Sequence, residues 1–275
     1  MSFSSKFVEN ILNLKFHQDW EEKNARFIKE PHAFLCSFPR SGNGWLRLVL
    51  AASLLGLTKK VDISSIELIR KINEKGVQFV CLSSGSHNYD LEDIFPDIYP
   101  MQPETHYELM SADVKSLHIP TKLIKTHHIV DCREHKTIFL FREPLSCLTS
   151  ASLLLNKEEI NTNPERINET MVYLLNFYNR MLSHYLEQHS KYPGNCIFIH
   201  HQSITTEPIP DIIRIFNSLG IKADRDIIEQ AVKQFPFKSG YDKAVKEFIS
   251  ESTKSDIKET IQNNYERAVE LSAIT

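Results

Sequence analysis

The sequence predicts a three-layer α/β fold in which helices cover both faces of a central parallel sheet. Short apolar segments that suit buried strands alternate along the chain with longer segments of helical periodicity. Alternation of this kind favours parallel strands joined by right-handed crossovers. The chain has 275 residues, of which 41% are hydrophobic and 24% charged. We expect one domain over residues 1–275, with an α/β core at 33–220 and a C-terminal helical part at 221–275.

Composition also narrows the expected location and partners. A formal net charge of −3 argues against a general nucleic-acid binder. The N-terminal residues lack the apolar core of a signal peptide, and the longest apolar run, 45–57, is too short to span a bilayer. Five scattered cysteines without C-x-x-C spacing favour reduced, buried thiols over disulfides or a zinc site. We therefore expect a cytoplasmic protein that does not bind membranes, as a monomer or a homodimer.

The first elements surround a short polar turn. Residues 5–29 have the pattern of an amphipathic helix. Phe34–Phe38 suits a strand buried on both faces, and Trp45–Leu55 suits a buried helix that ends with a left-handed cap at Gly56.

The next segment is expected to be less regular. Asp62 and Gly76 are placed to start and stop a helix over residues 63–75. Residues 76–114 are expected to form an irregular connection, rich in carboxylates and aromatic rings and devoid of Lys and Arg. A connection of this length inside a compact domain is usually functional or disordered, and its aromatic content favours an ordered binding segment.

Strands and helices alternate through the rest of the chain. Pro144 is placed to begin a helix, and Asn163 and Pro164 to begin a long one. The expected strands are Thr121–Thr126, Thr137–Phe141 and Asn195–His200, and the expected last helices are Pro210–Leu219, Asp224–Phe235 and Ser255–Leu271.

The turn at residues 39–44 predicts an anion site. Its two glycines allow close approach of the backbone to a ligand, the helix start offers N–H groups, and Arg40 adds a positive charge. An ordinary βα turn with a solvated arginine remains an alternative. A P-loop kinase fits less well, because Trp45 follows Gly44 where the P-loop motif requires lysine.

Each expected strand ends in a basic or titratable group. Ligands of open parallel sheets bind at the carboxyl ends of the strands, so we expect these side chains to face one site. They are Arg40, Lys125, His127, Arg142, His200 and His201.

The segment SFPRSGNGW resembles the 5′-phosphosulfate loop, usually close to YPKSGTTW, of sulfotransferases that use 3′-phosphoadenosine 5′-phosphosulfate (PAPS). The resemblance implies a P-loop-like phosphosulfate-binding turn in which Arg40 is the basic residue, Ser41 and Gly42 match, and Asn43 takes part. Trp45 falls on the position that packs against adenine. Gly44 departs from the pattern, because the family has a hydroxyl residue there.

Later segments extend the resemblance. LIKTHH is similar to the K-T-H segment, which implies that His127 is the catalytic base, with Lys125 and Arg40 stabilising charge on the leaving phosphate. FREPLSCLTS is similar to the 3′-phosphate motif, and Arg142 and Ser150 have its spacing. His201 falls at an adenine-side tyrosine. Phe237 and Lys238 are weak substitutes for the C-terminal basic loop.

The resemblance implies transfer of a sulfuryl group from PAPS to a small-molecule acceptor, leaving 3′-phosphoadenosine 5′-phosphate (PAP), with no metal required. The rival hypothesis is a nucleotide-binding protein of the same fold that has lost catalysis. The acidic and aromatic residues of 76–114 suit a cationic acceptor, an amine or guanidinium as readily as a hydroxyl, although they also suit an ordinary solvated surface. The candidates are Tyr89, Asp90, Asp93, Tyr99 and Tyr107.

Overall fold

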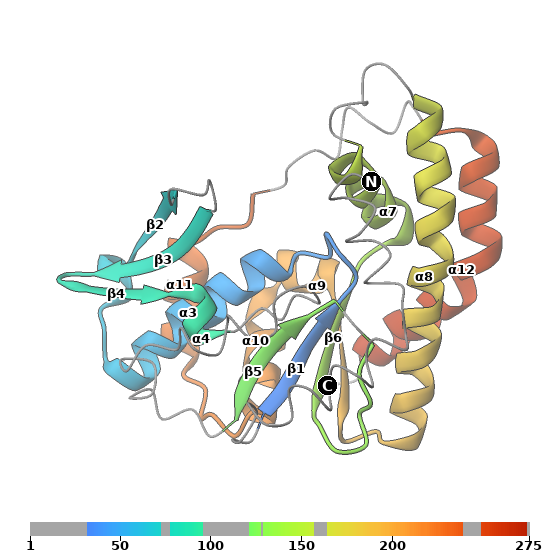
Figure 1. Cartoon of the computed structure of the whole chain (residues 1–275). Helices are drawn as coiled ribbons and strands as arrows, with labels where there is room; N and C mark the ends of the chain where they lie inside the picture. Colours follow the sequence, from blue (N-terminus) through green and yellow to red (C-terminus); the bar gives the residue numbers. More distant parts are fainter. Residues whose placement is uncertain are drawn as a thin grey trace, which may run out of the picture.

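A four-stranded sheet forms the middle layer of the protein (Figure 1). The structure is a computed structural model that describes residues 32–72, 78–95, 121–127, 129–156, 164–238 and 249–273. The sheet has the order β5-β1-β6-β7, and each neighbouring pair is parallel. The predicted parallel sheet is therefore confirmed. Its strands are β1 (His32–Ser37), β5 (Lys122–Thr126), β6 (Thr137–Phe141) and β7 (Cys196–His200).

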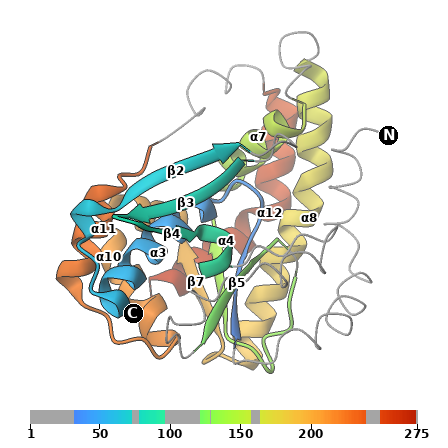
Figure 2. The ribbon, with the colours of Figure 1, turned by 60° about the vertical axis from the view of Figure 1, so that its left-hand side comes forward.

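Helices cover both faces of this sheet, because successive strand residues point to opposite sides. In β1, Phe34 and Cys36 belong to one buried cluster, whereas Ala33 and Leu35 belong to the other. The two views in Figures 1 and 2 show the same two helical layers, which confirms the three-layer prediction. The first cluster is completed by α7 (Pro144–Leu155), α8 (Pro164–Lys191) and α12 (Glu251–Ser272). The second is completed by α3 (Asn43–Lys59), α9 (His201–Thr206), α10 (Pro208–Ser218) and α11 (Arg225–Gln234).

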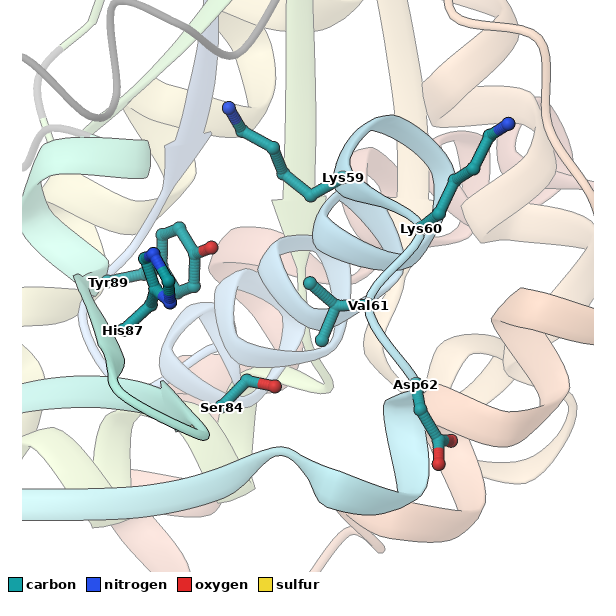
Figure 3. A pocket seen from close by; sticks show the side chains of 7 residues that line it. All are labelled: Lys59, Lys60, Val61, Asp62, Ser84, His87 and Tyr89. Atoms are coloured by element: carbon teal, nitrogen blue, oxygen red, sulfur yellow. The ribbon is translucent and has the colours of Figure 1, made fainter.

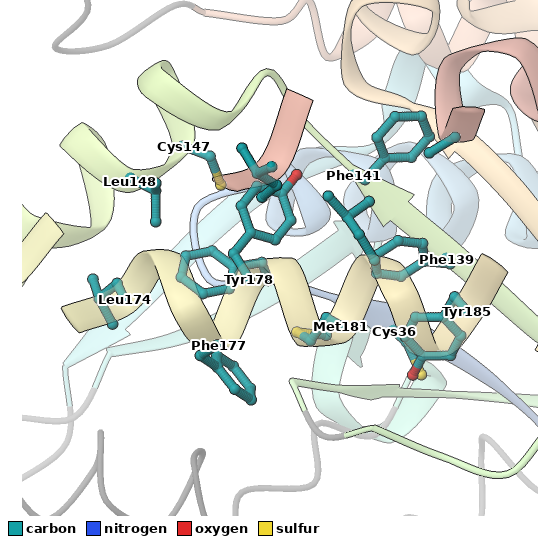
Figure 4. Packing of buried hydrophobic residues seen from close by; sticks show 14 of the residues in the cluster. Cys36, Phe139, Phe141, Cys147, Leu148, Leu174, Phe177, Tyr178, Met181 and Tyr185 are labelled. Atoms are coloured by element: carbon teal, nitrogen blue, oxygen red, sulfur yellow. The ribbon is translucent and has the colours of Figure 1, made fainter. Parts of the chain in front are cut away.

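Aromatic rings fill the space between α8 and the sheet (Figure 4). Tyr185 stacks on Phe139 with ring centroids 4.2 Å apart, and Tyr178 packs 4.7 Å from Phe38. Both tyrosines are fully buried. Large rings contribute much of the apolar area that a core removes from water, so the long helix is held against the sheet below the end of β1.

A second, antiparallel sheet replaces two of the predicted segments. Its strands are β2 (Glu67–Ile72), β3 (Gln78–Ser84) and β4 (His87–Asp90), and α4 (Leu91–Ile94) follows them. The predicted helix at 63–75 is wrong, and the irregular structure predicted for 76–114 is wrong over 78–95. Residues 96–114 lie outside the described residues. Asp62 caps only a 3-10 turn, η1 (Ile63–Ser65). Ile66 and Ile69 have the spacing of a helix face, whereas Ile66 and Leu68 have the period of two of a strand, and pairing with β3 decides between them.

The predicted cap at Gly56 is also wrong. Helix α3 continues to Lys59 and ends at Lys60, which has φ +53°. A Cβ atom at Gly56 would lie 2.6 Å from Ile63 and 2.8 Å from Ile227. Glycine is therefore needed inside this helix because η1 and α11 pack directly against its backbone.

Two helix starts, one with a proline and one with a capping aspartate, were predicted correctly. Helix α7 begins at Pro144, and α11 is capped by the Asp224 side chain, as expected. The last helices differ from their predicted bounds: α10 begins at Pro208, and α12 begins at Glu251 after a Ser250 cap. The helix expected at 5–29 lies outside the described residues.

All five cysteines are buried free thiols, as the sequence predicts. None of the helices in the described ranges combines the length and the apolar character that crossing a membrane would need.

Three histidines are expected to make the stability of the fold depend on pH. Burial lowers the pKa of His135, His184 and His200. In the unfolded chain the histidine pKa is about 6.5, so below that pH the unfolded state binds more protons, and the free energy of unfolding falls. We expect a lower Tm at about pH 5.5 than at about pH 7.5, measured by circular dichroism.

The matched test replaces two of these histidines with neutral side chains. In the variant carrying His184→Gln and His200→Gln, the difference in Tm between the two pH values should shrink. An undiminished difference would mean that other groups cause the pH dependence.

Candidate active site

The strand ends that the sequence singles out meet at one edge of the main sheet. Cys36 of β1 is level with Thr126 of β5, which precedes His127. Phe141 of β6, which precedes Arg142, is level with His200 of β7. Because all four strands are parallel, the groups that follow them lie along the same edge.

The turn between β1 and α3 has the backbone of an anion-binding loop. Arg40 and Gly42 have positive φ angles of 69° and 93°. Leu46 donates the first intrahelical hydrogen bond to Gly42, at 3.2 Å. The N–H groups before it have no partner within the helix, and they lie at the positive end of the helix dipole.

A buried thiol anchors this turn to α7. The Ser41 hydroxyl lies 3.4 Å from the Cys147 sulfur, and Cys147 donates to the Pro39 carbonyl at 3.4 Å. Burial raises the pKa of the Cys147 thiol to about 12, so it stays protonated and able to donate. The Ser41 side chain is thus directed toward α7, and sequence reasoning did not single out Cys147.

Two arginines and a serine from the phosphate motifs lie together. Arg40 Nε donates to Ser150 Oγ at 3.1 Å, and Arg142 Nη1 donates to the Arg40 carbonyl at 3.2 Å. The Tyr178 hydroxyl fixes the backbone of Arg142, because it accepts from the Arg142 N–H at 3.0 Å and donates to the Arg142 carbonyl at 2.5 Å. Two guanidinium groups at one site suit a ligand with more than one phosphate or sulfate group.

The contact between His127 and β1 defines which imidazole nitrogen can act as a base. His127 Nδ1 lies 2.7 Å from the Ser37 carbonyl oxygen. A carbonyl can only accept, so Nδ1 carries the proton, and Nε2 is the basic nitrogen. Lys125, which lies on β5 two residues before His127, is 2% exposed.

Trp45 and His201, which are expected beside adenine, form one aromatic group with Phe237, which is expected in place of the basic loop. The Phe237 ring meets Trp45 and His201 edge to face, with centroids 5.6 and 5.5 Å away. Trp45 Nε1 donates to the Phe235 carbonyl at 2.7 Å, which fixes its indole ring. Lys238 follows and is exposed. Rings from three distant parts of the chain therefore meet beside the turn, as a planar base would require.

The two glycines of the turn are expected to respond differently to substitution. A Cβ at Gly42 would lie 2.8 Å from His201 Cδ2, and its φ of +93° disfavours any side chain. A Cβ at Gly44 would have no atom within 4 Å. We expect Gly42→Ala to lower both Tm and PAP affinity, and Gly44→Ala to change neither, as measured by thermal shift and calorimetry.

Gly44 is also the position where the resembled loop carries a hydroxyl, and the space around it can hold one. Gly44→Ser should therefore bind PAP at least as tightly as the unsubstituted protein. A loss of affinity in Gly44→Ser, equal to that in Gly42→Ala, would contradict this description of the turn.

The structure describes only three of the five candidate acceptor residues. Asp90 ends β4 and Asp93 belongs to α4, while Tyr99 and Tyr107 lie outside the described residues. Tyr89 is buried and lines a pocket of about 420 Å³ between the hairpin and the end of α3 (Figure 3). Helix α3 has 17 residues, so this pocket is about 24 Å from the turn along its axis.

The charges of that pocket have a structural explanation. Lys59 and Lys60 stand at the C-terminus of α3, where cations complement the negative end of the helix dipole. The Asp62 carboxylate accepts hydrogen bonds from the backbone and hydroxyl of Ser64. Because the pocket lies at the C-terminal end of α3 and the turn lies at its start, Tyr89 is separated from the histidine and arginines at the sheet edge.

Comparisons with known proteins identify the family. Residues 30–268 match the family model described as the sulfotransferase domain. A curated relative, cytosolic sulfotransferase 17 of Arabidopsis thaliana, is 21% identical over 218 residues. The alignment covers 75% of this chain and 58% of the relative, so the chain spans little more than half of that protein's length.

Solved structures share the fold at low sequence identity. A putative steroid sulphotransferase of Arabidopsis thaliana has a TM-score of 0.56 at 19% identity, with 91% of this chain and 84% of that chain covered. Sulfotransferase STF9 of Mycobacterium avium has a TM-score of 0.51 at 9% identity, with 94% and 81% covered. Retinol dehydratase, in complex with androsterone and the inactive cofactor PAP, has a TM-score of 0.50 at 13% identity, with 95% and 93% covered. Because the family model matches residues 30–268 of the 275 in this chain, the chain belongs to the sulfotransferase domain family.

Proposed function

We propose that this protein is a PAPS-dependent sulfotransferase that acts on a hydroxyl or amine group of a small-molecule acceptor. The observation that carries the proposal is the contact between His127 Nδ1 and the Ser37 carbonyl, at the sheet edge that also holds Arg40 and Arg142. It leaves a basic nitrogen on a hydrogen-bonded ring at the sheet edge that carries two arginines. PAPS, when bound, would supply the sulfuryl group.

The donor set of this chain fits such a nucleotide. Arg40 and the N–H groups that open α3 would hold the 5′-phosphosulfate, and Arg142 and Ser150 the 3′-phosphate. Trp45 and Phe237 would contact adenine.

The proton and charge transfers then follow from the residues. His127 Nε2 would take the proton from the acceptor as its oxygen or nitrogen attacks sulfur. Arg40 and Lys125 would stabilise the negative charge that develops on the departing phosphate oxygens. Arg142 and Ser150 bind a part of the nucleotide that does not react, so they should contribute to affinity and not to the chemical step.

The acceptor class and the location are further parts of this proposal. Carboxylates near aromatic residues in 76–114, with Asp90 and Asp93 among them, favour a cationic acceptor. A cytoplasmic location is supported by the five free thiols, which are typical of reducing compartments.

One assay tests the activity and the acceptor together. Purified protein is incubated with ³⁵S-labelled PAPS and a panel of neutral phenols, alcohols, amines and guanidinium compounds. Transfer to any member supports the enzyme, and preference for amines or guanidinium compounds supports the cationic acceptor. Tight PAP binding without transfer to any member would favour the rival, a nucleotide-binding protein that has lost catalysis, for which Gly44 is the specific argument.

A further inference from the structure

The Asn43 side chain points inward from the turn. The sequence places Asn43 among the cofactor-binding residues, yet its Nδ2 donates to Ser37 Oγ at 2.7 Å. Ser37 is the last residue of β1 and is fully buried. The amide at the start of α3 is therefore bonded to the strand that leads into the turn.

Ser37 is also the residue that holds the imidazole. Its carbonyl oxygen accepts from His127 Nδ1 at 2.7 Å, and its hydroxyl oxygen lies 3.5 Å from the same nitrogen. Two donors, one from the phosphosulfate turn and one from the catalytic histidine, thus converge on a single buried residue. Ser37 ends β1, Asn43 begins α3, and His127 directly follows β5.

We propose that Asn43 and Ser37 are positioning residues that fix the tautomer and ring orientation of His127. The proposal rests on the proposed function, because it assigns His127 the role of base. Free histidine favours the Nε2–H tautomer, so a base that uses Nε2 requires an acceptor for the Nδ1 proton. The Ser37 carbonyl is that acceptor, and the bond from Asn43 holds Ser37 in place.

This arrangement couples the base to the turn that binds the sulfuryl donor. A displacement of the first residue of α3 would move Ser37 through the 2.7 Å bond, and the imidazole would move with it. Catalytic groups must be held close to their productive geometry, and hydrogen bonds from residues that do not touch the substrate commonly hold them. Asn43 then affects the rate through Ser37 and not by binding phosphate.

Four variants test the coupling. Ser37→Ala removes the hydroxyl, Asn43→Leu removes the amide at similar size, and the double variant removes both. Ser53→Ala is the matched control, because Ser53 is a buried serine of α3 whose hydroxyl has no hydrogen-bond partner among the described residues. Each protein is assayed for kcat, for KM with PAPS and for PAP affinity by calorimetry.

We expect Ser37→Ala and Asn43→Leu each to lower kcat about three- to tenfold, the range that corresponds to one neutral hydrogen bond, with PAP affinity unchanged. The double variant should be no worse than the worse single variant, since both changes remove the same contact. Ser53→Ala should match the unsubstituted protein. Weaker PAP binding in Asn43→Leu, without a loss of kcat in Ser37→Ala, would overturn the proposal and make Asn43 a phosphate ligand.

A measurement without turnover separates this proposal from the proposed function. The ¹⁵N chemical shifts of the His127 ring report which nitrogen carries the proton. We expect the Nδ1–H tautomer in the unsubstituted protein and a mixture of tautomers in Ser37→Ala and Asn43→Leu. An Nε2–H tautomer in the unsubstituted protein, or shifts that neither substitution changes, would overturn the positioning role, whether or not the protein transfers sulfuryl groups.

Discussion

His127→Ala is expected to lower kcat for sulfuryl transfer by about 10²- to 10⁴-fold, which is the usual contribution of a positioned base. The side chain is held by a 2.7 Å bond from Nδ1 to the Ser37 carbonyl, so Nε2 is the nitrogen able to accept a proton. PAP affinity should stay the same, because the phosphates are assigned to other side chains. Steady-state kinetics with labelled PAPS and calorimetry with PAP measure the two quantities separately.

A second histidine provides the control for this prediction. His87 is exposed and lines the pocket at the far end of α3, so His87→Ala should leave kcat unchanged. His128 follows His127 in the sequence, and its replacement should have a mild effect. If His128→Ala abolished transfer and His127→Ala did not, the register assigned to the K-T-H segment would be wrong.

The sequence predicted the part of the fold that depends on strongly periodic or punctuated segments. β6 was predicted at its observed bounds, because TIFLF has four apolar residues after Thr137 and lies just before Pro144, a residue suited to begin a helix. Parallel pairing followed from the alternation of strands and helices. It also brought Arg40, His127 and Arg142 to one edge before any contact was known.

The second sheet could not be predicted in the same way. The segment around Ile66 and Leu68 has apolar residues at spacings that suit a helix or a strand, and only its pairing with β3 selects the strand. The prediction that Gly56 caps helix α3 failed for a related reason. A glycine is a common helix cap, but here it admits two isoleucines from η1 and α11.

Contacts between distant side chains were also beyond the sequence. The motif assigned Asn43 to the cofactor, whereas in the structure its amide bonds to Ser37. The spacing of residues along the sequence does not indicate that the Cys147 thiol contacts the turn, or that Arg40 bonds to Ser150. The contacts of Cys147 and Ser150 join residues more than 100 positions apart, so the packing of α7 against the turn determines them.

The bond between Arg40 and Ser150 links the two regions that we propose to bind phosphate. Arg40 lies in the turn proposed for the 5′-phosphosulfate and Ser150 in the segment proposed for the 3′-phosphate, and they are 3.1 Å apart from Nε to Oγ. A guanidinium has five donors in a fixed plane. Arg40 can therefore keep this contact through Nε while its terminal nitrogens face an anion, which a lysine ammonium could not do with the same geometry.

Arg142→Met is expected to weaken PAP binding strongly and AMP binding little. The Arg142 guanidinium is held beside the turn by its bond to the Arg40 carbonyl, and its backbone is fixed by Tyr178. One charge-assisted hydrogen bond contributes about 1.5–3 kcal/mol, or about 10- to 150-fold in affinity. AMP lacks the 3′-phosphate, so it has no group for Arg142 to bind. Calorimetric titration of both nucleotides against both proteins gives the four affinities required.

Two further variants show whether the effect is specific to the 3′-phosphate. Ser150→Ala should also reduce the preference for PAP over AMP, by a smaller factor because a neutral hydroxyl is the weaker donor. Arg180→Met removes an exposed arginine of α8 and should change neither affinity. Equal weakening of PAP and AMP in Arg142→Met would show that Arg142 binds the nucleotide elsewhere. Equal affinity of the unsubstituted protein for PAP and AMP would remove the basis for PAPS as the donor.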